Sequence, residues 1–107
     1  MKSIIDHLNQ LNKIFDNRKR LGIMSILMVN DWVEYKTLKN LLKLTDGNLA
    51  SHMKALEKQE YIKVYKKFVG RKPNTTYAIT NTGERDFQDH LKALEKLILF
   101  NAKETNK

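Results

Sequence analysis

The spacing of hydrophobic residues changes twice along this 107-residue chain, and that change constrains the fold more than any single motif. Leu49, Met53 and Leu56 recur at the three- and four-residue intervals of an amphipathic helix. Ile62 and Val64 then follow the two-residue period of a strand, and helical spacing returns after residue 80. The chain is therefore predicted to be α+β, mainly α with a small β-hairpin.

The remaining apolar stripes predict the rest of the element order. Residues 1–107 contain no repeat, no linker and no low-complexity tract, so one domain is expected. The predicted order is helix, helix, short strand, helix, helix, strand, strand, helix. The apolar residues of the first helix are Ile4, Ile5, Leu8, Leu11 and Phe15, and those of the second are Leu21, Met24, Leu27 and Met28. The short strand runs from Trp32 to Tyr35. The third helix carries Leu38, Leu41 and Leu42.

The fourth helix has clear start signals at Thr45. Its hydroxyl suits an N-cap, and Leu44 and Leu49 occupy the positions of a hydrophobic staple. At roughly 100° per residue, the face opposite the apolar stripe is small or polar, and it holds Gly47, Ser51, Lys54 and Lys58, flanked by Asn48 and Ala55. A helix that enters the major groove needs such a face. Any exposed helix is also polar outside, so the face alone does not decide between DNA reading and solvent exposure.

The predicted hairpin is strongly basic. Its first strand is expected to be half-buried, and residues 69–74 are expected to form the loop. Five basic residues fall on it and no acidic residue lies between Glu60 and Glu84: Lys63, Lys66, Lys67, Arg71 and Lys72. A hairpin with this charge would lie along a DNA backbone, with Arg71 or Lys72 reaching a minor groove. The alternative is a solvated, lysine-rich hairpin.

The overall charge of +8 favours a polyanionic partner, although a lysine-rich composition alone would also produce it. The surplus lies within residues 1–76, since residues 77–107 carry five basic and five acidic side chains. Without cysteine, disulfides and thiolate chemistry are excluded. No apolar run is long enough to span a membrane and no signal peptide is present, so a cytoplasmic location is expected. Three scattered histidines and no phosphate loop indicate no enzyme, no metal and no cofactor.

Several segments together resemble winged helix-turn-helix regulators related to the MarR and ArsR groups, in a small single-domain branch. The resemblance covers roughly residues 18–98. It rests on residues 42–56 with Thr45-Asp46-Gly47-Asn48-Leu49, on Phe68-Val69-Gly70-Arg71-Lys72-Pro73, and on the Thr80-x-x-Gly83 opening of the last helix. It implies a DNA-binding dimer with a recognition helix in the major groove and a wing at the backbone or minor groove. Lys36 departs from the usual small polar cap.

The outer face of the fourth helix, the basic hairpin and the resemblance together predict the residues that contact DNA. They are Thr45, Asp46, Gly47, Asn48, Ser51, His52, Lys54, Lys58, Lys66, Lys67, Arg71, Lys72, Asn74 and Thr75. Asp46 would repel phosphate, so it accepts from a cytosine amino group or favours the helix start. His52 lies at the edge of the apolar stripe. It is either packed against neighbouring helices or in contact with a phosphate or base.

The terminal helices, residues 1–15 and 81–102, are predicted to form a homodimer interface. Their apolar positions are Ile4, Ile5, Leu8, Leu11, Phe87, Leu91, Leu94, Leu97 and Ile98. The alternative is that they pack only on each other within one chain. A two-fold dimer implies a pseudo-palindromic site with half-sites roughly 34–36 Å apart. Any small-molecule effector would bind between these helices and the helix from Leu21 to Met28.

The expected function is therefore sequence-specific, double-stranded DNA-binding transcriptional regulation, with repression the commoner outcome in the resembling family. The alternatives are a winged helix used for protein–protein contact, which predicts an apolar or acidic recognition face, and a non-specific nucleic-acid binder. Single-stranded RNA binding is disfavoured because interleaved stacking aromatics are missing.

Overall fold

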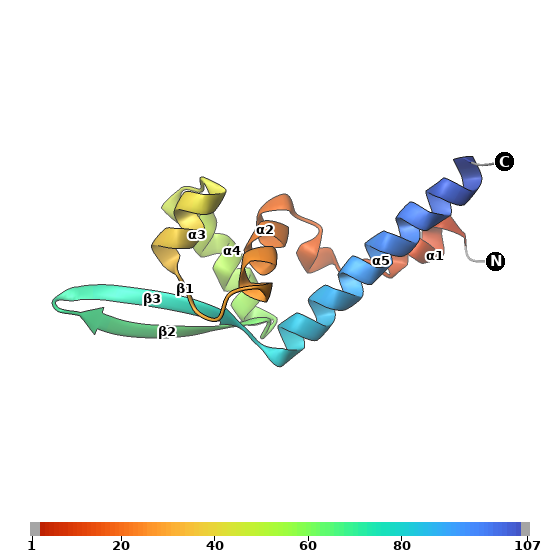
Figure 1. The fold of residues 1–107 in the computed structure, drawn as a ribbon. Coiled ribbons are helices and arrows are strands. Elements are labelled where there is room, and N and C mark those ends of the chain that lie inside the picture. The colour runs from red at the N-terminus through yellow and green to blue at the C-terminus, as the bar shows by residue number, and fades with distance from the viewer. Residues whose placement is uncertain (1–2, 106–107) are drawn as a thin grey trace.

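The computed structural model describes residues 3–105, with side chains over residues 3–102. Parts of the predicted domain and first helix, residues 1–2 and 106–107, lie outside the described residues. The described chain contains α1 (Ile4–Asn9), the 3-10 helix η1 (Lys13–Phe15), α2 (Arg18–Met28), β1 (Val33–Glu34), α3 (Tyr35–Leu42), α4 (Asp46–Lys58), β2 (Ile62–Val69), β3 (Lys72–Ile79) and α5 (Asn81–Thr105). The α+β winged-helix class is confirmed. The molecule is elongated, 63 × 26 × 21 Å, because the hairpin and α5 extend in opposite directions (Figure 1).

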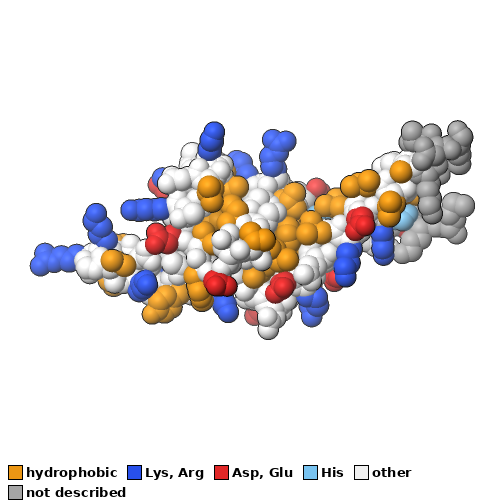
Figure 2. Space-filling view, viewed as in Figure 1, with side chains coloured by type: hydrophobic (Ala, Val, Ile, Leu, Met, Phe, Trp, Pro, Cys, Tyr) orange, Lys and Arg blue, Asp and Glu red, His pale blue; other side chains and the backbone are white. Residues whose placement is uncertain are grey.

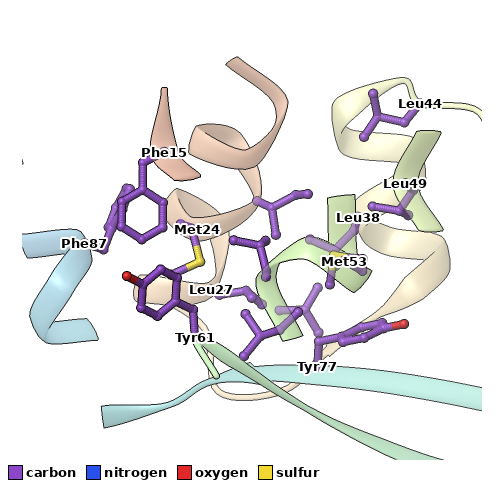
Figure 3. Close-up of a cluster of buried hydrophobic side chains, with 14 residues drawn as sticks. Phe15, Met24, Leu27, Leu38, Leu44, Leu49, Met53, Tyr61, Tyr77 and Phe87 are labelled. Atoms are coloured by element: carbon purple, nitrogen blue, oxygen red, sulfur yellow. The ribbon is translucent and has the colours of Figure 1, made fainter. Parts of the chain in front are cut away.

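The core lies between α2, α3, α4 and the root of the sheet (Figure 3). Ile23, Leu38, Leu49 and Leu56 are completely enclosed. Each fully buried aliphatic side chain of this size contributes about 1.5–3 kcal/mol relative to exposure. This core holds α3 and α4 in a fixed relative orientation, which is the first requirement for presenting one of them to a partner.

The turn between α3 and α4 follows local rules. Lys43 adopts the left-handed conformation (φ 52°) and ends α3. Thr45 caps α4, and its hydroxyl accepts from the backbone N–H of Asn48 at 3.2 Å. The predicted N-cap is confirmed, and both Leu44 and Leu49 are buried in the core. In α3, Leu38 is buried and Leu41 is exposed, because α3 packs through the side that carries Leu38.

The sheet is antiparallel in the order β1-β3-β2, with Val33 paired to Tyr77 and Ile62 paired to Ile79. The predicted loop over residues 69–74 is wrong, because Val69 already pairs with Lys72 and only residues 70–71 turn. Gly70 supplies the left-handed conformation this tight turn requires (φ 67°). The prediction that the first strand of the hairpin is half-buried is also wrong. Only Ile62 in β2 is buried, because the long hairpin projects beyond the helices (Figure 1).

The N-terminal segment differs from the continuous helix predicted through Phe15. Helix α1 ends at Asn9, and the Asn12 side chain then caps η1 by accepting from the N–H of Ile14 at 2.9 Å. The backbone N–H of Asn12 donates to Nδ1 of His90 on α5 at 3.0 Å. These bonds turn the chain away from the axis of α1, and Phe15 is buried in the core.

Helix α5 begins at Asn81, as the Thr80-x-x-Gly83 motif predicted, and its start packs against the segment that joins α4 to β2. The Thr80 hydroxyl accepts from the N–H of Gly83 at 2.9 Å and donates to the carbonyl of Glu60 at 2.6 Å. Phe87, predicted to face a second copy, is only 1% exposed and packs edge-to-face on Phe15, with ring centroids 5.1 Å apart. Phe87 is therefore not part of the dimer interface, because its side chain is already buried by contacts within one chain.

Candidate nucleic-acid interface

Helix α4 presents the outer face that its sequence predicted. Leu49, Met53 and Leu56 are buried, whereas the opposite side is open to solvent. The exposed residues there are Gly47, Asn48, Ser51, Lys54 and Lys58. No side chain meets a Cβ placed on Gly47, so the first turn has open space beside it. The face is small near its N-terminus and basic toward its C-terminus.

The acidic residue at the start of α4 is paired. The Asp46 carboxylate lies 3.1 Å from Nζ of Lys39 on α3, and the Tyr35 hydroxyl donates to the Asp46 carbonyl at 3.0 Å. An exposed ion pair of this kind contributes little stability. It does compensate the carboxylate charge that would otherwise repel a phosphate. Lys39 was missed from the sequence, because its role depends on how α3 and α4 pack and leaves no periodic signal.

His52 is half-buried and tied to the body of the protein. A guanidinium nitrogen of Arg20 lies 3.1 Å from Nδ1 of His52, and Arg20 Nε donates to the carbonyl of Ile14 at 2.6 Å. Arginine is always a donor, so Nδ1 accepts and the imidazole hydrogen resides on Nε2. Burial, followed by the positive charges of Arg20 and Lys19, lowers the pKa of His52. His52 is therefore a neutral ring with one N–H to offer. Arg20 was also missed, since a contact across 32 positions has no local signature.

The hairpin places its basic residues around an exposed tip. Lys66, Lys67, Arg71 and Lys72 are all exposed, and Figure 2 shows Lys and Arg side chains projecting from this end of the molecule. Asn74 and Thr75 differ, because they are half-buried and line an open groove of about 340 Å³ between the hairpin and the start of α3. The predicted wing residues thus divide into a basic tip and a groove behind it, which Lys72 also lines.

Helices α1 and α5 lie side by side, at the end of the molecule opposite the hairpin tip (Figure 1). They carry several exposed apolar side chains. The rings of His7 and Phe100 meet at 5.1 Å, so the two helices do pack within one chain. Many apolar side chains of α1 and α5 nevertheless remain exposed to solvent. The exposed side chains are Ile4, Ile5, Leu8, Leu91 and Ile98, and Leu99 adds another. Leu11, Leu94 and Leu97 are half-buried.

The region predicted to hold an effector is partly hollow. An open depression of about 590 Å³ lies where the end of α2 meets the start of α5, lined by Met28, Asn30, Trp32, Lys63 and Glu84 among others. It touches α2 as predicted but not α1, so an effector site between the terminal helices stays a prediction. Among the described residues, no group of side chains is arranged to hold a metal ion, and no helix is long and apolar enough to cross a membrane.

Two helices joined by a tight turn, beside a basic two-stranded wing, define the winged helix-turn-helix class. The chain belongs to the winged helix DNA-binding domain family, whose sequence pattern matches residues 19–98. The predicted winged helix-turn-helix class is confirmed, and the family is one of DNA-binding domains rather than of enzymes. Solved structures of MarR-family regulators share this fold.

Individual relatives agree with this assignment. An uncharacterized protein of Methanocaldococcus jannaschii is 34% identical over 79 residues, which cover 74% of this chain and 86% of that protein. The structure of a transcriptional regulator homologue from Pyrococcus horikoshii OT3 has a TM-score of 0.75 at 33% identity, covering 81% of this chain and 86% of its own. The fold is also shared with MepR of S. aureus in a DNA complex, with a TM-score of 0.70 at 12% identity over 96% of this chain and 85% of that chain.

Proposed function

We propose that this regulator binds a pseudo-palindromic operator in double-stranded DNA as a homodimer and represses transcription there. The observation that carries the proposal is the outer face of α4, which is exposed, small and polar, and stands beside a cationic hairpin. A protein-interaction helix would need an apolar or acidic face instead. MepR of S. aureus, which shares this fold, has been solved in complex with DNA, and this supports DNA as the partner.

In this proposal α4 enters the major groove with its N-terminal half toward the bases. Gly47 permits close approach, and Asn48 and Ser51 reach base edges, an amide being suited to adenine. Lys54 and Lys58 neutralise phosphates further along the helix. The tip residues Lys66, Lys67, Arg71 and Lys72 follow the backbone into the adjacent minor groove, where Arg and Lys are attracted by narrow A·T tracts.

Two residues that the structure adds refine these roles. Lys39 compensates Asp46, so the start of α4 approaches DNA without a free carboxylate. Arg20 holds the neutral His52 ring with its Nε2–H available, which suits donation to a phosphate oxygen. Of the remaining predicted contacts, Thr45 uses its hydroxyl to cap α4, and Asn74 and Thr75 line the groove behind the tip. We assign these three to supporting the interface rather than to base reading.

Dimerisation is inferred from the apolar surface of α1 and α5. Its most exposed members, Ile5 and Ile98, lie on the arm that extends away from the hairpin (Figure 1). A two-fold axis through this arm leaves both copies of α4 free to occupy half-sites about one helical turn apart. A dimer seated on promoter DNA would block access to it, which is the physical basis for proposing repression.

The proposal is tested by selecting bound duplexes from a random-sequence pool and measuring their affinity at two salt concentrations. The test variants are Ser51→Glu, on α4, and Arg71→Glu, at the hairpin tip. Lys92→Glu makes the same charge reversal as Arg71→Glu on an exposed site of α5 and serves as control. We expect a selected pseudo-palindrome whose binding is lost in the first two variants and retained in the third.

The alternatives give different results. Binding that selects no sequence and disappears with salt would reduce the protein to a non-specific polyanion binder. No binding at either salt concentration would favour a protein partner. Repression itself is measured by transcription from a promoter that carries the selected site, and a rise in transcript on adding the protein would make it an activator.

A further inference from the structure

One aromatic side chain on the hairpin has no role in the fold. Phe68 is 73% exposed, the highest value for any aromatic residue among the described side chains, and it lies outside the core cluster. None of the aromatic ring contacts in the described chain involves it. Its cross-strand partner is Pro73, and the two flank the turn at residues 70–71. Proline has a fixed φ, so Phe68 stands beside a rigid neighbour.

The position of Phe68 in the hairpin defines the side it faces. Alternation along the strands places Phe68 on the same face as Tyr77, because the pairs Phe68–Pro73 and Val64–Tyr77 are separated by an even number of residues. Tyr77 packs into the core, with its ring 6.4 Å from that of Tyr35 on α3. Phe68 thus faces the side of the sheet on which the helices lie, beyond the point where they cover it (Figure 1).

The charge around Phe68 indicates its partner. The sequence from residue 61 to residue 83 holds no acidic side chain, and no ion pair in the described chain involves Lys66, Lys67, Arg71 or Lys72. Two such tips repel each other, which disfavours a second copy as the occupant. A DNA duplex instead presents phosphates to the lysines and arginine, and stacked apolar base faces between them. DNA-bending proteins insert Phe or Pro between base pairs from the minor groove in this way.

We propose that Phe68, braced by Pro73, is a wedge that inserts between two base pairs in the minor groove when the wing docks, and thereby unwinds and kinks the operator. This inference rests on the proposed function and adds a second source of sequence preference. Pyrimidine–purine steps such as TA and CA unstack most easily, so the operator should carry one where each wing lands. In this proposal α4 recognises base edges by hydrogen bonding, whereas Phe68 is sensitive to how easily two neighbouring base pairs unstack.

The test is the linking number of closed circular plasmid DNA relaxed by a topoisomerase with the protein bound to saturation. An inserted ring unwinds the duplex, so the wild type shifts the topoisomer distribution. Phe68→Ala abolishes the shift while plasmid binding persists, and Phe68→Leu, which keeps an apolar wedge, restores most of it. Val69→Ala is the matched control, because Val69 is the adjacent exposed residue on the opposite face of the hairpin.

A second measurement uses the selected duplex with 2-aminopurine at the pyrimidine–purine step. Fluorescence rises on unstacking with the wild type and not with Phe68→Ala, whose affinity falls roughly five- to a hundredfold from the lost stacking. Thermal unfolding is the control for folding, and we expect Phe68→Ala to unfold at the wild-type temperature because Phe68 is exposed.

The outcomes separate the wedge from the proposed function. Equal topoisomer shifts for the wild type and Phe68→Ala would overturn the wedge and leave DNA binding intact. A change in oligomeric mass without a change in linking number would assign Phe68 to self-association and overturn it as well. If the wild type bound neither plasmid nor selected duplex, the proposed function would fail and the wedge with it.

Discussion

At the scale of single residues, the attachment of α5 depends on Gly83. A Cβ at this position would overlap the carbonyl oxygen of Tyr61 and lie 2.9 Å from its carbonyl carbon. The obstruction is backbone, which cannot rotate away as a side chain does. Thr80 fastens the same junction by donating to Glu60 and accepting from Gly83. Close approach, rather than left-handed conformation, is the reason for this glycine.

Gly83→Ala should therefore lower the free energy of unfolding by about 1–3 kcal/mol or more, the cost of overpacking against a fixed neighbour. The measurement is urea unfolding followed by circular dichroism. Gly47→Ala is the control for stability, because nothing lies within 4 Å of its Cβ and alanine favours a helix. Equal stability of the Gly83 variant and the wild type would mean that α5 can shift its point of attachment freely.

A second residue-scale prediction concerns pH. Burial lowers the pKa of His90, with a smaller opposing effect of Asp16, and burial together with Arg20 and Lys19 lowers that of His52. Both histidines bind protons more readily in the unfolded chain, whose pKa is about 6.5. Their contribution to stability is complete above that value and is lost as pH falls toward the lower folded pKa.

Unfolding free energy should consequently decrease as pH falls below about 6.5, with the buried His90 contributing at most about 1.4 kcal/mol per pH unit. His90→Asn keeps an acceptor for the N–H of Asn12 but does not titrate, so its stability should vary less with pH. Urea unfolding at several pH values between 7.5 and 5 compares the two proteins. An unchanged pH dependence in the variant would exclude His90 as its source.

At the scale of elements, the short 3-10 helix connects the N-terminal arm to the DNA-binding body. Phe15 in η1 packs on the rings of Tyr61, Phe87 and His90, at centroid distances of 5.0, 5.1 and 5.5 Å respectively. Asn12 donates from its side chain to the Tyr61 hydroxyl at 3.0 Å, and that hydroxyl donates to Asp86 at 2.9 Å. The 3-10 helix, the segment between α4 and β2, and α5 therefore meet at this cluster.

Phe15→Ala should cost about 3–5 kcal/mol, the range for emptying a fully packed aromatic site. Phe68→Ala removes the same ring from an exposed strand and should change stability by less than about 0.5 kcal/mol. Thermal unfolding of the two variants side by side makes the comparison. If both lost the same stability, η1 would not be part of the cooperative core.

Sequence periodicity identified most elements but not which surface each one buries. The capping signals at Thr45 and Thr80 are local, so their predictions were confirmed. Phe87 is predicted to be an interface residue because helical spacing cannot distinguish contact within a chain from contact between chains. The length of the hairpin was underestimated, since Pro73 and Gly70 signal a turn but not how few residues it needs. The contacts of Lys39 with Asp46 and of Arg20 with His52 arise only once α2, α3 and α4 have packed.

At the scale of the whole molecule, the open apolar surface on α1 and α5 predicts self-association. The double variant Leu91→Glu with Ile98→Glu places two charges on this surface and should convert a dimer of 12.6 kDa chains to monomer. Light scattering coupled to size exclusion gives the mass. Lys96→Glu, on an exposed position of the same helix, should leave the dimer intact. A monomeric wild type at micromolar concentration would contradict the proposed interface.

Helix α5 runs without proline or an interior glycine from its start at the α4–β2 junction to Thr105. Its 25 residues span about 38 Å at 1.5 Å per residue. In a dimer whose contacts lie in the C-terminal half of α5, this long helix connects the interface to the body of the domain, which is attached at Gly83. A tilt of about 10° at the joint between copies would displace each recognition helix by roughly 6 Å, close to the rise of two base pairs at 3.4 Å each. The spacing between half-sites in the operator would then depend on the angle at which the two α5 helices cross.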